Sequence, residues 1–215
     1  MAEEFGQFQP NHVPHDDADR HSPSSDLEIV HEGKFLNFVR RGRWEYVTRC
    51  NATNVVAVVA IHDDERIVLV EQFRPPVQAY VIELPAGLVG DEPEAASSGA
   101  DATGGVVLPS RSGSRVESAL DAAQREVLEE TGYKASDWAY LLPGLSSGGL
   151  TDESVCFFSA RRLHRHSPGG GVGSERIRVH EVPLSGLAQW LNTCRGDGKL
   201  IDAKLLAGVY AATRF

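Results

Sequence analysis

The sequence predicts an α+β fold in which helices pack on both faces of a mixed β-sheet, an α/β/α sandwich. The order of the expected elements is the first reason, because strands come first, one helix follows at residues 117–131, and more strands precede two final helices. Such an order favours a sheet covered by helices. Composition is the second reason, since 41% hydrophobic and 24% charged residues in a chain of 215 are typical of a globular protein.

The first 53 residues divide into two segments. Residues 1–25 carry three prolines, three histidines and no periodic pattern, so we expect a disordered N-terminal arm. Residues 26–53 are rich in strand-forming patterns and form a β-rich segment. Short strands are expected there at 27–30, 34–40 and 43–50.

The main domain is expected at residues 54–215. The strongly apolar runs at 54–61 and 66–72, joined by a polar turn, are typical of buried strands. Residues 88–116 are rich in Gly, Ser and Ala and predict a long surface insertion. The other expected elements are strands at 80–84, 138–142, 154–160 and 177–182, a loop at 167–173 containing glycines, and helices at 183–194 and 202–214.

Charge and cysteine usage exclude several classes of partner and site. The net charge of −9 argues against duplex nucleic acid and fits a protein that gathers cations to meet a small anion. No apolar run approaches the roughly 18 residues that a membrane span needs. Cys50, Cys156 and Cys194 are too widely spaced to indicate a disulfide framework or a zinc site, so a reducing cytoplasm is expected.

The run from Arg125 to Tyr133 concentrates negative charge. Glu126, Glu129 and Glu130 fall on one face of the expected helix, where each exposed like-charged pair costs a few tenths of a kcal/mol. A solvated acidic face is one interpretation; an oxygen-rich site for Mg²⁺ or Mn²⁺ is the other. Arg125, four residues before Glu129, can hold that carboxylate and is therefore a candidate catalytic residue.

The flanking residues favour the metal-site interpretation, because the run resembles the Nudix hydrolase signature, G-x5-E-x7-R-E-U-x-E-E-x-G-U, with U apolar. Every position from Glu117 onward matches. The signature glycine should be residue 111, which is an arginine here. Gly87, within the sequence L-P-A-G-L at 84–88, is similar to the missing glycine, so the signature is split by the insertion. The entropic cost of closing a loop grows only logarithmically with its length, which makes such a split tolerable.

The resemblance implies the Nudix fold and Mg²⁺-dependent (or Mn²⁺-dependent) hydrolysis of a diphosphate bond. The implied metal ligands are the carboxylates of Glu126, Glu129 and Glu130 and the backbone carbonyl of Ala86. Glu175, in the late loop, and Glu129 are the alternatives for the base that activates water.

Four further residues are implied to bind substrate. Arg74 would contact the diphosphate, which suits a guanidinium fork, although a surface arginine at a strand end is the alternative. Trp44 would stack on adenine, often from the partner subunit in related enzymes, or is a partly buried strand residue. Glu83 is a substrate contact or a structural carboxylate, and Glu153 helps bind substrate or metal or is an ordinary turn acid.

The motifs divide between two branches of the family. The sequences Q-F-R-P-P at 72–76 and L-P-A-G-L are similar to ADP-ribose pyrophosphatases, whereas the stretch 167–175 is similar to enzymes acting on GDP-mannose and UDP-sugars. We therefore expect a nucleoside diphosphate sugar as substrate, with ADP-ribose, giving AMP and ribose 5-phosphate, ahead of GDP-mannose or a UDP-sugar. A non-catalytic Nudix-like ligand sensor is the other class, and the retained glutamates argue against it.

The resemblance also implies a homodimer. Related enzymes of this branch are homodimers whose N-terminal strands cross to the partner subunit. Residues 26–53 are therefore the predicted dimerisation segment.

Overall fold

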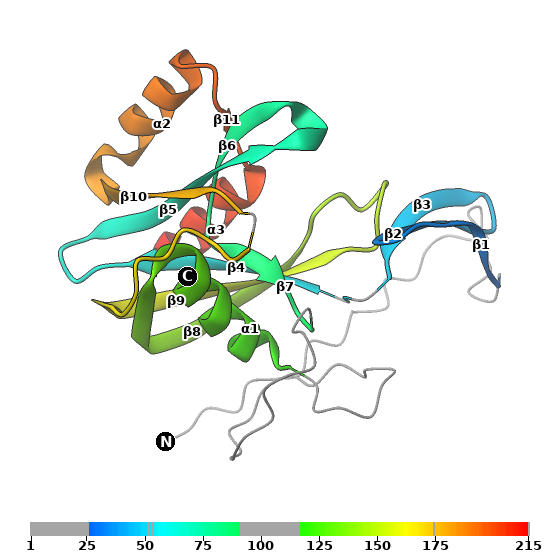
Figure 1. Cartoon of the computed structure of the whole chain (residues 1–215), viewed down its shortest axis with the longest axis horizontal. Coiled ribbons are helices and arrows are strands. Elements are labelled where there is room, and N and C mark those ends of the chain that lie inside the picture. The colour runs from blue at the N-terminus through cyan, green and yellow to red at the C-terminus, as the bar shows by residue number, and fades with distance from the viewer. Residues whose placement is uncertain (1–25, 51, 53, 91–116, 174, 215) are drawn as a thin grey trace.

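The computed structural model describes residues 26–50, 52, 54–90, 117–173 and 175–214. The predicted arm at 1–25 and residues 91–116 of the predicted insertion lie outside this part of the chain. The described residues form an eight-stranded mixed sheet and a separate three-stranded sheet (Figure 1). The predicted α+β class, with its mixed sheet and N-terminal β-rich segment, is confirmed.

The three-stranded sheet projects from the body of the protein (Figure 1). It is antiparallel, and the loop before β9 holds it to the main domain. The backbone N–H of Val47 donates to the carbonyl of Leu150 at 2.9 Å, and the hydroxyl of Thr48 donates to Asp152 at 2.9 Å. The strands are β1 (Leu27–Glu32), β2 (Leu36–Arg41) and β3 (Trp44–Arg49).

The main sheet has the strand order β11-β6-β5-β4-β9-β8, with β7 paired to β4 and β10 paired to β5. Every residue of β4 is buried, because this central strand is covered on both faces, which explains its uninterrupted apolar sequence. The strands are β4 (Asn54–Ile61), β5 (Arg66–Arg74), β6 (Ala79–Glu83), β7 (Ala86–Leu88), β8 (Tyr133–Leu145), β9 (Ser154–Arg165), β10 (Ile177–Pro183) and β11 (Leu200–Ile201).

Alternate residues of β4 belong to two hydrophobic cores, as the period of a strand requires. Val55, Ala57 and Val59 face the core shared with α2 (Leu187–Gly196) and α3 (Ala203–Arg214). Val56, Val58 and Ala60 face the core shared with α1 (Ala119–Glu126). Figure 1 shows α1 on one side of the sheet and α3 on the other, so the layered arrangement is the predicted one.

Several elements differ from the sequence-based expectation. The helix predicted at 117–131 is α1 followed by a π-helix, η2 (Val127–Thr131), with Ser118 as the N-cap of α1. Strands β8 and β9 are longer than predicted because they pair along their whole length. Strands β7 and β11 were not predicted, since runs of three and two residues carry no periodicity, and β7 includes residue 88 of the predicted insertion. Short 3-10 turns lie at Pro75–Val77 (η1) and Leu184–Gly186 (η3).

None of the helices in the described segments combines the length and apolar character needed to cross a bilayer.

The core beneath α3 gives a test of the fold. Leu205 is fully buried against the sheet, whereas the neighbouring Leu206 is 56% exposed. Because truncating a buried leucine leaves a cavity, Leu205→Ala should lower the free energy of unfolding by about 2–5 kcal/mol, measured by urea denaturation. Leu206→Ala, the matched control, should change it by less than about 1 kcal/mol. Equal effects at the two positions would contradict this packing.

Candidate active site

The two halves of the split signature meet in space. Strand β7 carries Ala86 and Gly87, and the backbone N–H of Ala86 donates to Oε2 of Glu130 at 3.0 Å. Gly87 lies so close to Glu126 that a Cβ atom there would be 1.8 Å from Oε1 of that carboxylate. Only a glycine leaves room for Glu126 in this position, which is what the role of Gly87 as the signature glycine requires.

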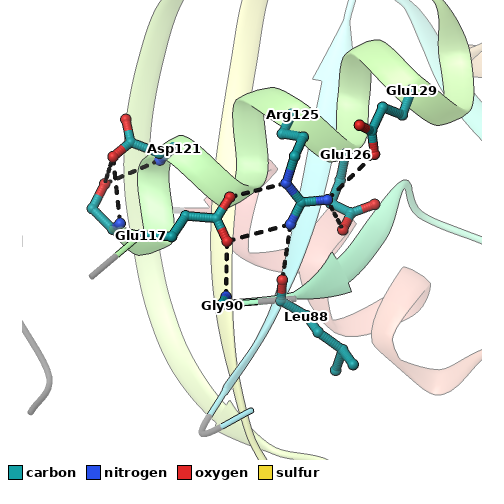
Figure 2. A network of polar contacts seen from close by, with 8 residues as sticks. Leu88, Gly90, Glu117, Asp121, Arg125, Glu126 and Glu129 are labelled. Atoms are coloured by element: carbon teal, nitrogen blue, oxygen red, sulfur yellow. Dashed lines mark hydrogen bonds and ion pairs between the residues drawn. The ribbon is translucent and has the colours of Figure 1, made fainter. Parts of the chain in front are cut away.

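Arg125 is the cationic centre of the site (Figure 2). Its Nη1 donates to Glu126 at 2.7 Å and to Glu129 at 3.3 Å, and its Nη2 donates to the carbonyl of Leu88 at 3.0 Å. Burial lowers the pKa of Arg125, but its carboxylate partners outweigh that effect and raise the pKa above its ordinary value. Arg125 thus stays charged, partly neutralises the acidic helix face and ties that face to β7.

Glu117 has a role that the sequence alone did not reveal. Its Oε1 accepts a hydrogen bond from Nε of Arg125 at 2.9 Å, and its Oε2 accepts one from the backbone N–H of Gly90 at 2.8 Å (Figure 2). Helical spacing does not indicate this pair, because Glu117 precedes Ser118, the N-cap of α1, and only side chains three or four residues apart are neighbours on a helix. Glu117 therefore positions Arg125 and the chain after β7.

Burial of the signature carboxylates is electrostatically costly. It raises the pKa of Glu126 to about 7, and the charges of Glu129 and Glu175 add to the rise against the effect of Arg125. Burial also raises the pKa of Glu130 well above its ordinary value, with further contributions from Glu126, Glu175 and Glu83. Carboxylates crowded in this way are stabilised by a bound cation.

The donor chemistry of this cluster fits Mg²⁺ or Mn²⁺, both of which prefer carboxylate and carbonyl oxygens. Within the described part of the chain, no three His, Cys, Asp or Glu side chains already converge as a cation site. The fit therefore rests on the carboxylate oxygens available. Burial first, and then repulsion between neighbouring glutamates, raises the pKa of Glu126 and Glu130, and a cation would offset both effects.

The late loop brings a fourth carboxylate to the cluster. Glu175 lies close enough for its charge to raise the pKa of both Glu126 and Glu130. Its own Oε2 accepts a hydrogen bond from the backbone N–H of Val172 at 2.9 Å. The structure thus groups Glu175 with the signature glutamates, although about 45 residues separate them in sequence.

Arg74 and Glu83 form an ion pair on the neighbouring strands β5 and β6. Nε of Arg74 donates to Oε1 of Glu83 at 2.9 Å, and a second bond joins Nη2 to Oε2. The charge of Glu130 contributes to the raised pKa of Arg74, after the larger effect of the bond to Glu83, so Arg74 lies near Glu130. Glu83 is buried and holds Arg74. Of the two interpretations of Glu83, a substrate contact or a structural carboxylate, this arrangement fits the second.

Two of the predicted site residues do not join the cluster within one chain. Glu153 accepts a hydrogen bond from Nε of Arg49 at 2.6 Å and helps to tether the three-stranded sheet. Trp44 begins β3 on that sheet, which projects away from α1 (Figure 1). Its side chain is 49% exposed.

Comparison with known proteins points to one family. The NUDIX domain family model matches residues 52–190. The chain is 32% identical to the mouse ADP-sugar pyrophosphatase over 207 residues, which cover 84% of this chain and 82% of that protein. It is 33% identical to the Bacillus subtilis ADP-ribose pyrophosphatase over 110 residues, or 50% and 45% of the two chains.

A third relative carries a different substrate in its name. The chain is 31% identical to the GDP-mannose pyrophosphatase of Klebsiella pneumoniae over 149 residues, which cover 65% of this chain and 60% of that protein. Among solved structures, the crystal structure of an ADP compounds hydrolase superposes with a TM-score of 0.60. That match covers 87% of this chain and 89% of the other at 17% identity, so it supports the fold.

The contact between Gly87 and Glu126 generates a prediction. Gly87→Ala should displace the Glu126 carboxylate and weaken Mn²⁺ binding at least about tenfold, or 1.4 kcal/mol, because the new Cβ would occupy the space of that carboxylate. The melting temperature should change little, since the displaced group is the end of a flexible side chain. Isothermal titration calorimetry with Mn²⁺ measures the effect. The control is Gly149→Ala, since a Cβ at Gly149 would meet nothing within 4 Å. Unchanged Mn²⁺ affinity in Gly87→Ala would refute a role for the contact between Gly87 and Glu126 in binding the cation.

Proposed function

The chain belongs to the Nudix hydrolase family, and from that we propose that it hydrolyses the diphosphate bond of a nucleoside diphosphate sugar, with ADP-ribose as the leading substrate. The products from ADP-ribose are AMP and ribose 5-phosphate. The observation that carries the proposal is a pair of carboxylates, the half-buried Glu126 and the buried Glu130, held against the backbone of Ala86 and Gly87. A site of this kind suits a substrate that arrives with its own negative charge and a divalent cation.

We propose Mg²⁺ or Mn²⁺ as the cation. Glu126, Glu129 and Glu130 would hold it through their carboxylates, and the backbone carbonyl of Ala86 would complete the set. When bound, it would neutralise phosphate oxygens and help deprotonate the attacking water.

Glu175 is the proposed general base. The oxygen of a water molecule forms a bond to one phosphorus, the bond from that phosphorus to the bridging oxygen breaks, and Glu175 accepts the water's proton. Glu129 is the alternative, but Arg125 donates a hydrogen bond to its Oε2 at 3.3 Å, which occupies one of its two oxygens. Glu175 instead accepts from a neutral backbone N–H.

Arg74 is the proposed diphosphate ligand. Its guanidinium lies near Glu130 and is oriented by two hydrogen bonds to Glu83. Since guanidinium groups carry five donors, Arg74 can keep its bonds to Glu83 while donating to phosphate oxygens. In this proposal Glu83 positions Arg74 and needs no contact with the substrate.

Two lines of support favour an adenine nucleotide over other nucleotide sugars. The sequences Q-F-R-P-P and L-P-A-G-L resemble the ADP-ribose branch, and two of the relatives act on ADP-sugars or ADP-ribose by name. GDP-mannose is the second candidate, supported by the glycine-rich late loop and by the relative named for that substrate.

We also propose a homodimer formed through the three-stranded sheet. All six residues of β1 are exposed, and β1 is an edge strand with one side unpaired in the sheet. Exposed apolar patches and open strand edges are typical of interaction surfaces. The exposed apolar side chains of this sheet and its turns are Leu27, Ile29, Val30, Phe35, Leu36 and Trp44.

The free thiols of the three cysteines support the expected location in a reducing cytoplasm.

Substrate preference is tested by comparing kcat/KM for ADP-ribose, GDP-mannose and UDP-glucose with Mg²⁺, with AMP or the corresponding nucleotide detected by chromatography. ADP-ribose should have the highest kcat/KM, by about tenfold or more. Chelation of the metal with EDTA should abolish turnover. If kcat/KM were higher for GDP-mannose than for ADP-ribose, GDP-mannose would become the leading substrate. No turnover of any of the three compounds would overturn the proposed function.

The variant Glu130→Gln, assayed with the same three substrates, tests the assignment of Glu130 to the cation site. It keeps the shape of the side chain and an oxygen to accept from the N–H of Ala86, but it removes the charge. Turnover should fall by at least about 10³-fold while the circular dichroism spectrum is unchanged. Retained activity would refute the assignment of Glu130 to the cation site.

The proposed dimer is tested by analytical ultracentrifugation. The wild-type protein should sediment with twice the mass of one chain, and Ile29→Lys should shift it towards monomer because a lysine would be buried in an apolar interface. Leu206→Lys, which adds the same charge at an exposed position of α3, should remain a dimer. A monomeric wild-type protein would contradict the proposal.

A further inference from the structure

The C-terminal end of the signature helix requires hydrogen-bond donors from outside. The last turn, Val127–Thr131, is a π-helix, and Gly132 follows in the left-handed region with φ 76. Turns of this type often occur at functional sites. The final carbonyls of a helix have no partner within it, so neighbouring groups must supply donors.

The glycine-containing loop at 167–173 supplies these donors through its backbone. The N–H of Gly170 donates to the carbonyl of Glu130 at 2.8 Å, and the N–H of Gly171 donates to the carbonyl of Glu129 at 3.0 Å. Residues 166 and 167 both donate to the carbonyl of Gly132, at 2.8 and 3.1 Å. The residues that carry the signature carboxylates are therefore fixed by the loop that leads to Glu175.

The two segments approach so closely that neither tolerates a side chain at the point of contact. Gly169 has φ +69, and a Cβ atom there would lie 2.4 Å from the carbonyl carbon of Thr131 and 2.5 Å from the nitrogen of Gly132. A Cβ atom on Gly132 would lie 2.1 Å from the carbonyl oxygen of Ser167. All three of these atoms belong to the backbone and cannot turn aside as a side chain could.

We propose that Gly169 is a positioning residue. By allowing backbone contact between the loop and the end of the signature helix, it sets the position of Glu175 relative to Glu129 and Glu130. The proposal rests on the function proposed above, since that function makes the relative position of these carboxylates matter. A displacement of reacting groups by about 1 Å can cost about 100-fold in rate.

Gly173 provides a matched control in the same loop. It also has a positive φ, +61, so an alanine there carries a similar backbone penalty. A Cβ atom at Gly173, however, would meet nothing within 4 Å. Gly169→Ala and Gly173→Ala therefore differ in the contact with the helix end and share the backbone strain.

The first measurement is the steady-state rate of the full-length variants with ADP-ribose and Mg²⁺. Gly169→Ala should lower kcat by about 10- to 100-fold with KM changed less than about threefold, because the catalytic carboxylates move while the Arg74 contact remains. Gly173→Ala should stay within about threefold of wild type in both parameters. Equal losses of kcat in the two variants would overturn the proposal.

Amide hydrogen exchange, followed by NMR, tests the contact without any turnover. The N–H groups of Gly170 and Gly171 should be protected in the wild type and in Gly173→Ala but exchange at least about tenfold faster in Gly169→Ala. Unchanged protection in Gly169→Ala would overturn the proposal. If the wild-type protein turned over no nucleotide sugar, the proposed function would fail, whereas this exchange result would still report on the contact.

If Gly169→Ala does not fold, the variant Arg165→Gln provides a second test of the contact between the loop and the end of the helix. Arg165 holds the loop by donating to the carbonyls of Ser167 at 3.0 Å and Pro168 at 2.8 Å, and it is exposed. Arg165→Gln should speed exchange at residues 170 and 171, whereas Arg161→Gln, which breaks an exposed ion pair with Glu65, should not. Equal exchange in these two arginine variants would likewise contradict the proposal.

Discussion

The crowding of carboxylates that are largely withdrawn from water is the constraint on which the rest of the site depends. Glu126 and Glu130 lie on one helical segment and are largely withdrawn from water, which raises the pKa of both. Neighbouring groups stabilise the two carboxylates and leave space for them. Arg125 supplies the opposing charge, and Ala86 donates its backbone N–H to Glu130. Gly87 leaves space that any side chain would fill.

The same constraint explains why the site draws on segments far apart in the chain. A single helix cannot satisfy its own terminal carbonyls, and Arg125 on this helix neutralises its carboxylates only in part. Strand β7 approaches from one side, with its backbone N–H and its glycine, and the loop at 167–173 approaches the helix end with two more N–H groups. Arg74 brings a second positive charge from β5. The acidic helix thus organises three other parts of the protein around it.

Features set by local sequence could be predicted. The buried strand Asn54–Ile61 was predicted because covering both faces of a strand demands an unbroken apolar run. The acidic face of α1 and η2 was predicted because its spacing is fixed within one helix. The meeting of Gly87 with the helix followed from the family signature and agrees with the structure, even though residues 91–116 lie outside its described part.

Features set by contacts between distant residues could not be predicted. Glu153 had two alternatives in sequence, and its bond to Arg49 depends on how the three-stranded sheet packs. The role of Glu117 depends on the N–H of Gly90, across the split. The π turn at Val127–Thr131 has a helical pattern like any other, and its hydrogen bonds depend on the late loop. Periodicity reports on one element at a time and carries no information about such pairings.

A crystal structure with Mg²⁺ and an ADP-ribose analogue whose bridging oxygen is replaced by methylene tests the central claim most directly. The account predicts a divalent cation bound by carboxylates of Glu126 and Glu130, with the diphosphate between that cation and Arg74. A cation bound elsewhere, or a diphosphate remote from the Ala86–Gly87 strand, would contradict it.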